Sequence, residues 1–517
     1  MRPTIVVDDA LGWAAEAFGG LGNLVLVPGG AIDRGVVADA DALVVRTVTR
    51  INEALVAGSR LRFVGTATAG IDHVDVDALA RADIRFASAA GSNADAVTDY
   101  VVTALHIVAL ERDPSLLAGP CAIVGFGQVG RRLATRLRAL GVEVRVCDPP
   151  LARTLDTLDR SDPWSRLALD EPLMSLADAV AGARIVSVHV PLQPVGPDRT
   201  PNLIDRGVLD LLAPNAVVVN TSRGSIVDEG ALRTWLDRTG SRAILDVWTG
   251  EPEIDPSIVL HPRVRIATPH IAGYSVEGKV AATAMIAEAL ATHLGVAHSW
   301  SGADVLGVPV DISIPSGPSA LARTTRCLRE HNPIERDDAA LRAIARASAP
   351  RGRAFEGLRR HYAWRRSLAH HRVDGNAEPD LVHAGVRAKP SEPLILIAHG
   401  SPDPDWRIPL DATAARLRTA HPHRHIGLAF LDHLEPSLAG AVAAVEQLGH
   451  DSVRVIAVFL SPGGGHIKRD IPALCERVAL AFPGVRVTLA PSAIGAEADV
   501  IESIARAVAR VGDRPLP

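Results

Sequence analysis

Three polar residues of different kinds each follow a separate apolar run in the middle of the chain. Arg223 lies in Asn-Thr-Ser-Arg-Gly, Glu251 in Asp-Val-Trp-Thr-Gly-Glu-Pro, and His270 in Thr-Pro-His-Ile-Ala-Gly-Tyr. A guanidinium can hold a carboxylate with two hydrogen bonds, and an imidazole can take a hydroxyl proton near neutral pH. A carboxylate next to that imidazole can hold its orientation. The set predicts hydride removal from a hydroxy acid, although singly the three could be a solvated arginine, a turn glutamate and a capping histidine.

A glycine pattern lies upstream of these residues. Gly125, Gly127 and Gly130 form Gly-x-Gly-x-x-Gly between an apolar run and a helical pattern. Such glycines permit a tight turn, close approach of a pyrophosphate and close packing of helix on strand. Asp148 ends the next apolar run, where a carboxylate accepts hydrogen bonds from ribose hydroxyls and repels a 2′-phosphate. The pattern predicts NAD rather than NADP; the alternative is a surface Asp-Pro-Pro turn.

Two histidines near the C-terminus also follow apolar runs. His399 lies in Ala-His-Gly-Ser and His466 in Gly-Gly-Gly-His. Parallel strands would place both imidazoles on one sheet edge, where they could hold a divalent ion or accept a pyrrole proton. Glu435 could add a carboxylate. We interpret the pair as a metal or tetrapyrrole site, although one such histidine alone would need no function.

Short apolar runs alternate with longer helical patterns, which predicts an α/β protein with parallel sheets. The runs expected to be strands are 24–27, 42–45, 63–65, 84–86, 122–124, 143–147, 185–189, 217–220, 243–246, 264–267, 394–398 and 453–460. Helices are expected over 93–110, 279–294, 319–329, 339–347 and 355–366.

Composition narrows the class of protein. The chain has 517 residues, enough for several domains, and a formal net charge of −5, which favours neither nucleic acid nor an anionic membrane as partner. No apolar run reaches the roughly 20 residues of a membrane helix. The four cysteines lie far apart and no signal segment opens the chain, so we expect a cytoplasmic protein without a disulfide framework.

The motifs around the three catalytic candidates and the glycines resemble the D-2-hydroxyacid dehydrogenase family. That resemblance implies a Rossmann NAD-binding domain and a flavodoxin-like substrate domain. The chain is most similar to the branch that oxidises 4-phospho-D-erythronate in one bacterial route to pyridoxal 5′-phosphate. The narrower similarity rests on Val-Val-Arg-Thr-Val-Thr, Phe-Val-Gly-Thr-Ala-Thr-Ala-Gly-Ile-Asp-His, Cys-Asp-Pro-Pro and a tail resembling an α+β dimerisation domain. It implies a homodimer acting on a small molecule.

The resemblance also implies contacts for individual residues. NAD would be touched by Gly125, Gly127, Gln128, Val129, Gly130, Asp148, Val190, Thr221, Ser222, Asp246 and Gly273. Substrate would be touched by Thr47, Thr68 and Tyr274. Val190 stands where the family often has threonine, and Asp99 replaces a usual glutamate. The substrate phosphate has two candidate partners: Arg46, or the cluster Arg359, Arg360, Arg365 and Arg366, which could also be a solvated helix face.

Residues 393–510 resemble the small, single-lobe sirohydrochlorin cobaltochelatases. This similarity is carried by Ala-His-Gly-Ser, Leu-Glu-Pro-Ser-Leu and the glycine run before His466, which is one residue longer than expected. It implies a chelatase-like domain in which His399 and His466 bind a divalent metal such as Co, Ni or Fe. The alternative is a module that binds metal or tetrapyrrole without catalysis.

The sequence therefore predicts a fused protein. The expected domains are a substrate domain (1–95 with 275–300), an NAD domain (96–274), a dimerisation domain (303–372), a linker (373–391) and a chelatase-like domain (392–517). The expected reaction is NAD-dependent oxidation of 4-phospho-D-erythronate to 2-oxo-3-hydroxy-4-phosphobutanoate. One rival is another D-2-hydroxyacid dehydrogenase, such as one acting on 3-phosphoglycerate. A second is a metal- or tetrapyrrole-binding protein with a vestigial dehydrogenase.

Overall fold

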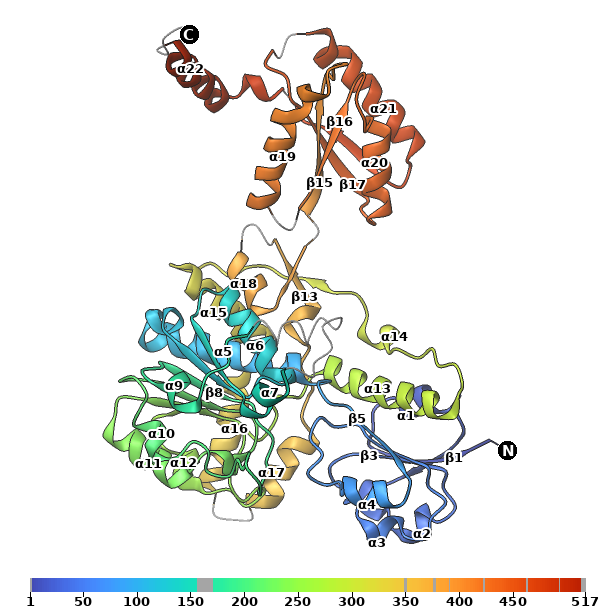
Figure 1. Cartoon of the computed structure of the whole chain (residues 1–517), viewed down its shortest axis with the longest axis vertical. Coiled ribbons are helices and arrows are strands. Elements are labelled where there is room, and N and C mark those ends of the chain that lie inside the picture. The colour runs from blue at the N-terminus through green and yellow to red at the C-terminus, as the bar shows by residue number, and fades with distance from the viewer. Residues whose placement is uncertain are drawn as a thin grey trace. The chain divides into compact units, whose positions relative to one another are not determined.

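The computed structural model describes residues 2–155, 171–347, 351–374, 378–389, 391–421, 424–461, 464–491 and 493–512. The chain divides into two compact units, residues 1–372 with 380–387, and residues 373–379 with 388–517 (Figure 1).

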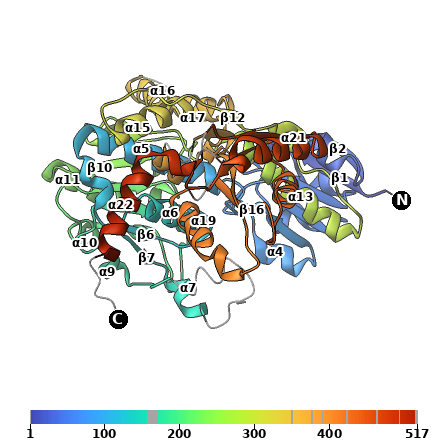
Figure 2. The ribbon, with the colours of Figure 1, turned by 90° about the horizontal axis from the view of Figure 1, so that it is seen from above.

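The first unit begins with a parallel five-stranded sheet of order β2-β1-β3-β4-β5. Its strands are β1 (Thr4–Asp8), β2 (Asn23–Val27), β3 (Ala42–Val45), β4 (Phe63–Thr66) and β5 (Arg85–Ser88). Its helices are α1 (Ala14–Phe18), α2 (Arg34–Val37), α3 (Glu53–Val56) and α4 (Val76–Arg81), and α13 (Val276–Leu294) returns to it from later in the chain. Apolar clusters cover both faces of the sheet, and α13 packs on β4 and β5. Figure 1 and Figure 2 both show α13 beside this sheet. This order confirms the flavodoxin-like expectation.

A second parallel sheet of order β7-β6-β8-β9-β10-β11 forms the Rossmann domain. Its strands are β6 (Cys121–Val124), β7 (Val144–Cys147), β8 (Ile185–Val188), β9 (Val217–Asn220), β10 (Arg242–Leu245) and β11 (Val264–Ala267). The associated helices are α5 (Ala94–Arg112), α6 (Gln128–Ala139), α7 (Pro149–Thr154), α9 (Leu176–Val180), α10 (Arg206–Leu209), α11 (Glu229–Arg238) and α12 (Pro256–Val259). Because all six strands are parallel, the residues that follow them gather at one edge.

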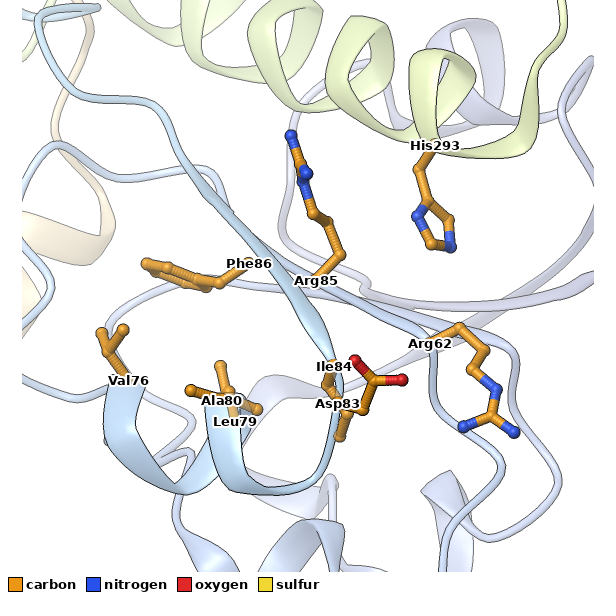
Figure 3. A pocket seen from close by; sticks show the side chains of 9 residues that line it. All are labelled: Arg62, Val76, Leu79, Ala80, Asp83, Ile84, Arg85, Phe86 and His293. Atoms are coloured by element: carbon orange, nitrogen blue, oxygen red, sulfur yellow. The ribbon is translucent and has the colours of Figure 1, made fainter.

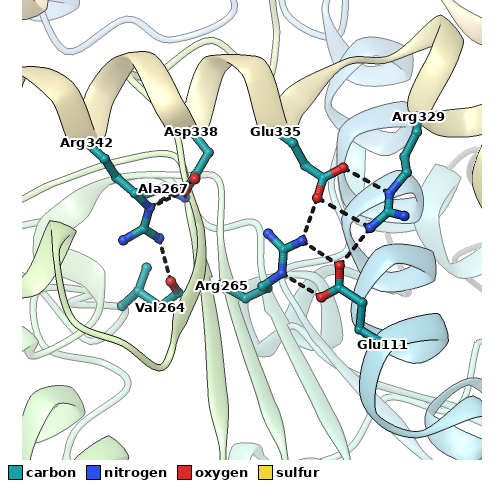
Figure 4. A network of polar contacts seen from close by, with 8 residues as sticks. All are labelled: Glu111, Val264, Arg265, Ala267, Arg329, Glu335, Asp338 and Arg342. Atoms are coloured by element: carbon teal, nitrogen blue, oxygen red, sulfur yellow. Dashed lines mark hydrogen bonds and ion pairs between the residues drawn. The ribbon is translucent and has the colours of Figure 1, made fainter.

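A third segment packs against the Rossmann domain. It contains α14 (Ala303–Leu306), β12 (Val310–Asp311), α15 (Ala320–His331), α16 (Ile334–Arg346), α17 (Arg351–Arg360) and β13 (His371–Val373). An ion-pair network fastens it, in which Arg265 of β11 donates to Glu111 of α5 (2.7 Å) and Arg329 of α15 donates to the same carboxylate (2.7 Å) (Figure 4). Nearby, Asp338 of α16 accepts from the Ala267 amide at 2.7 Å.

The stretch predicted as a linker contains regular structure. Helix α18 (Pro379–Ala384) lies within it, and strands β14 (Arg387–Ala388) and β15 (Ser391–Ala398) follow. Leu381 and Ala384 are fully buried in the first unit, and the Ala384 carbonyl accepts a hydrogen bond from Arg136 at 3.1 Å. In the sequence, the charged residues scattered through 373–391 hide the short apolar segment that makes these contacts. Residues 375–377 and 390 of the predicted linker lie outside the described part.

The second unit is built on a parallel four-stranded sheet of order β16-β15-β17-β18. Its remaining elements are β16 (Arg424–Phe430), β17 (Ser452–Ala457), β18 (Arg486–Leu489), α19 (Ile408–Ala420), α20 (Leu438–Gln447), α21 (Ile471–Ala481) and α22 (Ala498–Gly512). Apolar clusters lie on both faces of this sheet. The fold class predicted from the sequence, α/β with parallel sheets, is confirmed.

None of the four cysteines forms a disulfide, and all four are buried. Within the described ranges, no helix combines the length and apolar character needed to cross a membrane.

Candidate active site

The loops after β10 and β11 bring two of the predicted catalytic residues together. Nδ1 of His270 lies 2.8 Å from Oε2 of Glu251, and Oε1 of Glu251 accepts from the Trp248 amide at 2.9 Å. Burial alone would raise the pKa of the Glu251 carboxyl, but the hydrogen bond and charge of His270 outweigh it and lower that pKa. Glu251 is therefore an ionised acceptor that orients the imidazole and leaves its Nε2 for chemistry.

The backbone that carries His270 is held by Asp246. Oδ1 of Asp246 accepts from the Ile271 amide and Oδ2 from the Ala272 amide, both at 2.8 Å. The Thr268 hydroxyl donates to Oδ1 at 2.6 Å. This bonding fixes a loop in which His270 has a φ of 59°, in the left-handed region. Burial raises the pKa of Asp246 to about 6. Asp246 was expected to touch NAD; the structure shows a carboxylate that is 1% exposed and bonded to the loop.

Arg223 lies at the end of the neighbouring strand β9. Its loop is ordered by Asn220, whose side chain donates to the Arg223 carbonyl at 2.9 Å and accepts from the Ser222 amide at 3.1 Å. The guanidinium reaches the first lobe, which is the domain built on the five-stranded sheet. There Nε donates to Oδ2 of Asp72 at 2.9 Å. Gly70 is so close that a Cβ there would lie 2.1 Å from Nη2 of Arg223. Arg223 therefore lies where the two lobes of the unit meet.

The glycine loop has the conformation that the sequence predicts. Gly125 has a φ of +95°, and a Cβ on Gly130 would lie 1.9 Å from the Gly125 carbonyl oxygen. Gly127 faces open space, and α6 starts there without a side-chain cap, so its first amides are available to an anion. Asp148 accepts from the Phe126 amide at 2.8 Å and from the Leu151 amide at 2.9 Å, which fastens the loop to the end of β7.

The other residues expected around NAD surround this loop or the β9 and β11 ends. Val190 is adjacent to Gly125, and Gln128 lies against Gly91. The Thr221 hydroxyl is buried without a hydrogen-bond partner in the described part of the chain. An open glycine cradle, uncapped amides and an orphaned hydroxyl fit a dinucleotide. Ser222 donates to Asn220, Gly273 lies against Asn93, and Val129 is half-buried in the first turn of α6.

The three expected substrate residues lie on separate loops: Thr47 follows β3, Thr68 follows β4, and Tyr274 lies between β11 and α13. The Thr68 hydroxyl donates to the Gly70 carbonyl at 2.9 Å and lies 2.8 Å from the Thr66 hydroxyl, which contacts His73 at 2.9 Å. Burial lowers the pKa of His73. Thr47 and Tyr274 line a cavity of about 570 Å³.

The arginines expected to bind phosphate fall into two groups. Arg46, Arg359 and Arg360 line the same cavity as Thr47. Arg365 is buried and donates to the carbonyls of Ile271 (3.1 Å) and Ala96 (3.2 Å). Arg366 donates to Glu277 at 2.7 Å and to the Leu306 carbonyl at 2.6 Å. The structure therefore assigns Arg365 and Arg366 to internal bonds, because the chain leaves helix α17 after Arg360 and turns back toward Ser275.

In the second unit, the two predicted histidines meet. The ring centroids of His399 and His466 lie 4.8 Å apart at an interplanar angle of 85°. Nδ1 of His466 lies 2.8 Å from Oδ2 of Asp470. Glu435 does not join them; its carboxylate accepts from the Ser437 amide at 2.7 Å. Within the described ranges, no group of three or more His, Cys, Asp or Glu side chains is placed to hold a metal ion.

Comparisons with known proteins agree with this geometry. Residues 114–272 match the model of the D-isomer specific 2-hydroxyacid dehydrogenase NAD binding domain, and residues 393–511 match the CbiX model. The fold, the glycine loop and these matches are those of a D-2-hydroxyacid dehydrogenase joined to a CbiX-like unit.

Full-length relatives narrow the family. The chain is 41% identical over 384 residues to the erythronate-4-phosphate dehydrogenase of Serratia proteamaculans, which covers 73% of this chain and 98% of the relative. It is 44% identical over 365 residues to that of Edwardsiella ictaluri (70% and 92%) and 41% identical over 384 residues to that of Salinibacter ruber (72% and 95%). The chain belongs to the erythronate-4-phosphate dehydrogenase family.

Sequence reasoning missed three residues of this site. Asp72 and Asn220 each belong to a quoted motif, and Asn220 precedes the expected NAD contact Thr221, but their partners follow only from the fold. Lys279 gave one usable signal, since it is one of only three lysines in the chain. Lys279 lines the cavity, with its ammonium 4.3 Å from the Tyr274 ring centroid.

Proposed function

We propose that the first unit oxidises 4-phospho-D-erythronate at C2 to 2-oxo-3-hydroxy-4-phosphobutanoate with NAD⁺. The observation that carries this proposal is the His270–Glu251 pair on the sheet edge that also presents Arg223. Relatives that share about two fifths of their residues over nearly their whole length are named for this substrate, which supports the proposal.

Each residue has a defined part in the reaction. Arg223 holds the substrate carboxylate. Nε2 of His270 takes the C2 hydroxyl proton, and Glu251 keeps the imidazole oriented and stabilises its charged form. NAD⁺, when bound, would supply the acceptor for the hydride that leaves C2 of the substrate. Gly125, Gly127 and Gly130 with the first turn of α6 would hold its pyrophosphate, and Asp148 its adenosine ribose.

NADH production by the full chain tests this proposal. We expect turnover of 4-phospho-D-erythronate at a kcat/KM far above those for 3-phosphoglycerate and D-lactate. Equal rates, or preference for 3-phosphoglycerate, would leave only a D-2-hydroxyacid dehydrogenase of another specificity.

For the second unit we propose metal insertion into a tetrapyrrole, with the divalent ion (Co, Ni or Fe) as substrate. The His399–His466 contact and the CbiX match support it. Two imidazoles can receive a metal ion and accept pyrrole protons. The test is insertion of Co²⁺ into sirohydrochlorin by the full chain and by His399→Ala and His466→Ala variants. Binding of Co²⁺ without insertion would instead identify a non-catalytic binding module.

We also propose that the protein is a cytoplasmic homodimer. Four cysteines without a disulfide suit a reducing compartment, and the segment 303–372 resembles a dimerisation domain. Light scattering of the purified chain would report twice the 54.5 kDa chain mass if this is right.

A further inference from the structure

The cavity lined by Thr47 and Tyr274 collects positive charge from three parts of the first unit. Arg46 comes from the loop after β3, Lys279 from the first turns of α13, and Arg359 from α17. The other titratable groups that line or adjoin it are Asp8, Asp9, Tyr274, Glu356 and Arg360. Asp9, Glu356 and Arg360 are exposed, so solvent screens them more than the three inner cations.

Lys279 and Arg359 both line this cavity and are half-buried. The Lys279 ammonium lies 4.3 Å from the Tyr274 ring centroid and 5.8 Å from that of Trp364. Its pKa is lowered to about 8 by burial and then by the charges of Arg46 and Arg359. Nε of Arg359 is buried and has no hydrogen-bond partner among the described residues. An anion that enters the cavity would stabilise these half-buried cations and give the Arg359 Nε an acceptor.

Arg46 is different because it already has a partner. Its Nε and Nη2 donate to the two carboxylate oxygens of Asp8 at 3.1 Å and 3.0 Å, and Asp8 is fully buried. This pair is close to neutral, so the net positive charge of the inner cavity comes from Lys279 and Arg359.

We propose that Lys279 and Arg359, with Arg46 as a neutralised donor, bind the terminal phosphate of the hydroxy-acid substrate, an inference that rests on the proposed function. A phosphate dianion offers three acceptor oxygens to donors from three directions. The cavity also includes Thr47 and Tyr274, and Arg359 lies close enough to Glu251 to lower the pKa of that carboxyl. Tyr274 lies on the loop between β11 and α13 that also carries His270, so the proposed phosphate site and the proposed base share that loop.

A second hollow of about 590 Å³ supplies a matched control. It lies between α4, β5 and the end of α13, where His293 projects toward Arg62 and Arg85 (Figure 3). Its three basic side chains are exposed, and Asp83 lies among them. Arg85→Met therefore removes one positive charge from the same lobe without touching the proposed site.

The experiment compares 4-phospho-D-erythronate with unphosphorylated D-erythronate in the full chain. We expect Lys279→Met to raise KM for the phosphorylated acid by roughly 10- to 100-fold, the range of a lost charged hydrogen bond. KM for D-erythronate stays within about threefold, Lys279→Arg recovers part of the loss, and Arg85→Met leaves both substrates unchanged. An equal rise in KM for both acids, or no rise for either, overturns the inference.

Inorganic phosphate separates this inference from the proposed function. We expect it to bind the wild-type chain in calorimetry and to bind Lys279→Met at least roughly tenfold more weakly. If the wild type does not oxidise 4-phospho-D-erythronate, the proposed function fails, and Lys279-dependent phosphate binding still supports the anion site. If phosphate binds both proteins equally, the site is wrong, whatever the substrate.

Discussion

Arg223 and Asp72 form an ion pair between the two lobes of the first unit, with Nε of Arg223 2.9 Å from Oδ2 of Asp72. The same guanidinium is the proposed anchor for the substrate carboxylate. Asp72 therefore occupies hydrogen-bond donors that the substrate needs. Its side chain is 47% exposed, so the pair contributes no more than about 1 kcal/mol.

We predict that Asp72→Asn lowers KM for the hydroxy acid and leaves kcat nearly unchanged. A loss of about 1 kcal/mol of competition corresponds to about a fivefold change in binding. Initial-rate kinetics measure both constants. A fall in kcat at constant KM would show instead that Asp72 positions Arg223 for the chemical step.

His270→Ala is predicted to lower kcat by about 10²- to 10⁴-fold, the usual contribution of a positioned acid–base group. NAD⁺ binding, measured by calorimetry, is retained because the glycine loop and α6 follow β6, whereas His270 follows β11. A variant that turns over at the wild-type rate would remove the assignment of His270.

Glu251→Gln tests the partner of that imidazole. The amide of glutamine can donate to Nδ1, which favours the tautomer in which Nε2 carries the proton and cannot accept one. We expect a loss in kcat of about 10²-fold or more, with KM little changed. Glu229→Gln is a suitable control because Glu229 accepts from the Thr249 amide nearby without touching His270. Similar losses in both variants would indicate a general effect of charge.

Asp246→Asn is predicted to disturb the loop that carries His270. Asparagine offers one acceptor oxygen, so the Ile271 or the Ala272 amide loses its partner, at a cost of about 1–3 kcal/mol of unfolding free energy. The fall in kcat of this variant should be larger than its fall in affinity for NAD⁺.

The pH dependence of stability checks the same residue. Burial raises the pKa of Asp246 from 3.8 to about 6, so the folded chain binds this proton more tightly than the unfolded chain. This carboxyl therefore reduces stability as pH rises from 3.8 to about 6. Denaturant unfolding of Asp246→Asn should lack that decline; an unchanged pH slope would contradict the assignment.

Much of the first unit could be predicted from the sequence because parallel strands, fully buried on both faces, appear as short continuous apolar runs. The strands over 42–45, 217–220 and 264–267 were predicted with the bounds observed for β3, β9 and β11. The residues that follow such strands must share an edge, which is why Glu251 and His270 could be paired. Helix α17 was expected to continue to 366 but ends at Arg360, because Arg365 bonds to distant backbone carbonyls. Bonds of that kind, like the Asp72 and Asp8 pairs, join residues far apart in the sequence and leave no periodic signal.

The end of the dehydrogenase unit offers a further test. A chain that stops at residue 372 loses α18, with the fully buried Leu381 and Ala384 and the 3% exposed Val386. Each fully buried Leu or Val contributes about 1.5–3 kcal/mol, partly offset by the entropy of ordering the segment. We predict that the free energy of unfolding of this chain, measured in urea, is about 2–4 kcal/mol lower than that of a chain that stops at residue 388. Equal midpoints would show that α18 adds nothing to the unit.

The proposed phosphate site predicts a pH profile that depends on the substrate. A phosphate monoester becomes a dianion above pH ~6. The pKa of Lys279 is lowered to about 8, so in the free enzyme the ammonium is lost as pH rises through that value. Affinity for the phosphorylated acid should therefore be greatest between about 6 and 8, and KM should rise above pH 8 by up to about tenfold per unit.

The same desolvated lysine affects folding with the opposite sign. Because its folded pKa lies below the 10.5 of the unfolded chain, the unfolded state binds more protons between the two values, and stability from this group increases as pH rises from about 8 to 10.5. A rise in KM above pH 8 cannot then be attributed to Lys279 destabilising the fold. Initial rates from pH 6 to pH 9.5 with 4-phospho-D-erythronate and D-erythronate separate the cases. The alkaline rise in KM should occur only with the phosphorylated acid and should disappear in Lys279→Arg, whose guanidinium keeps its charge. The same rise with both acids would place the titrating group at the carboxylate or hydroxyl end of the substrate instead.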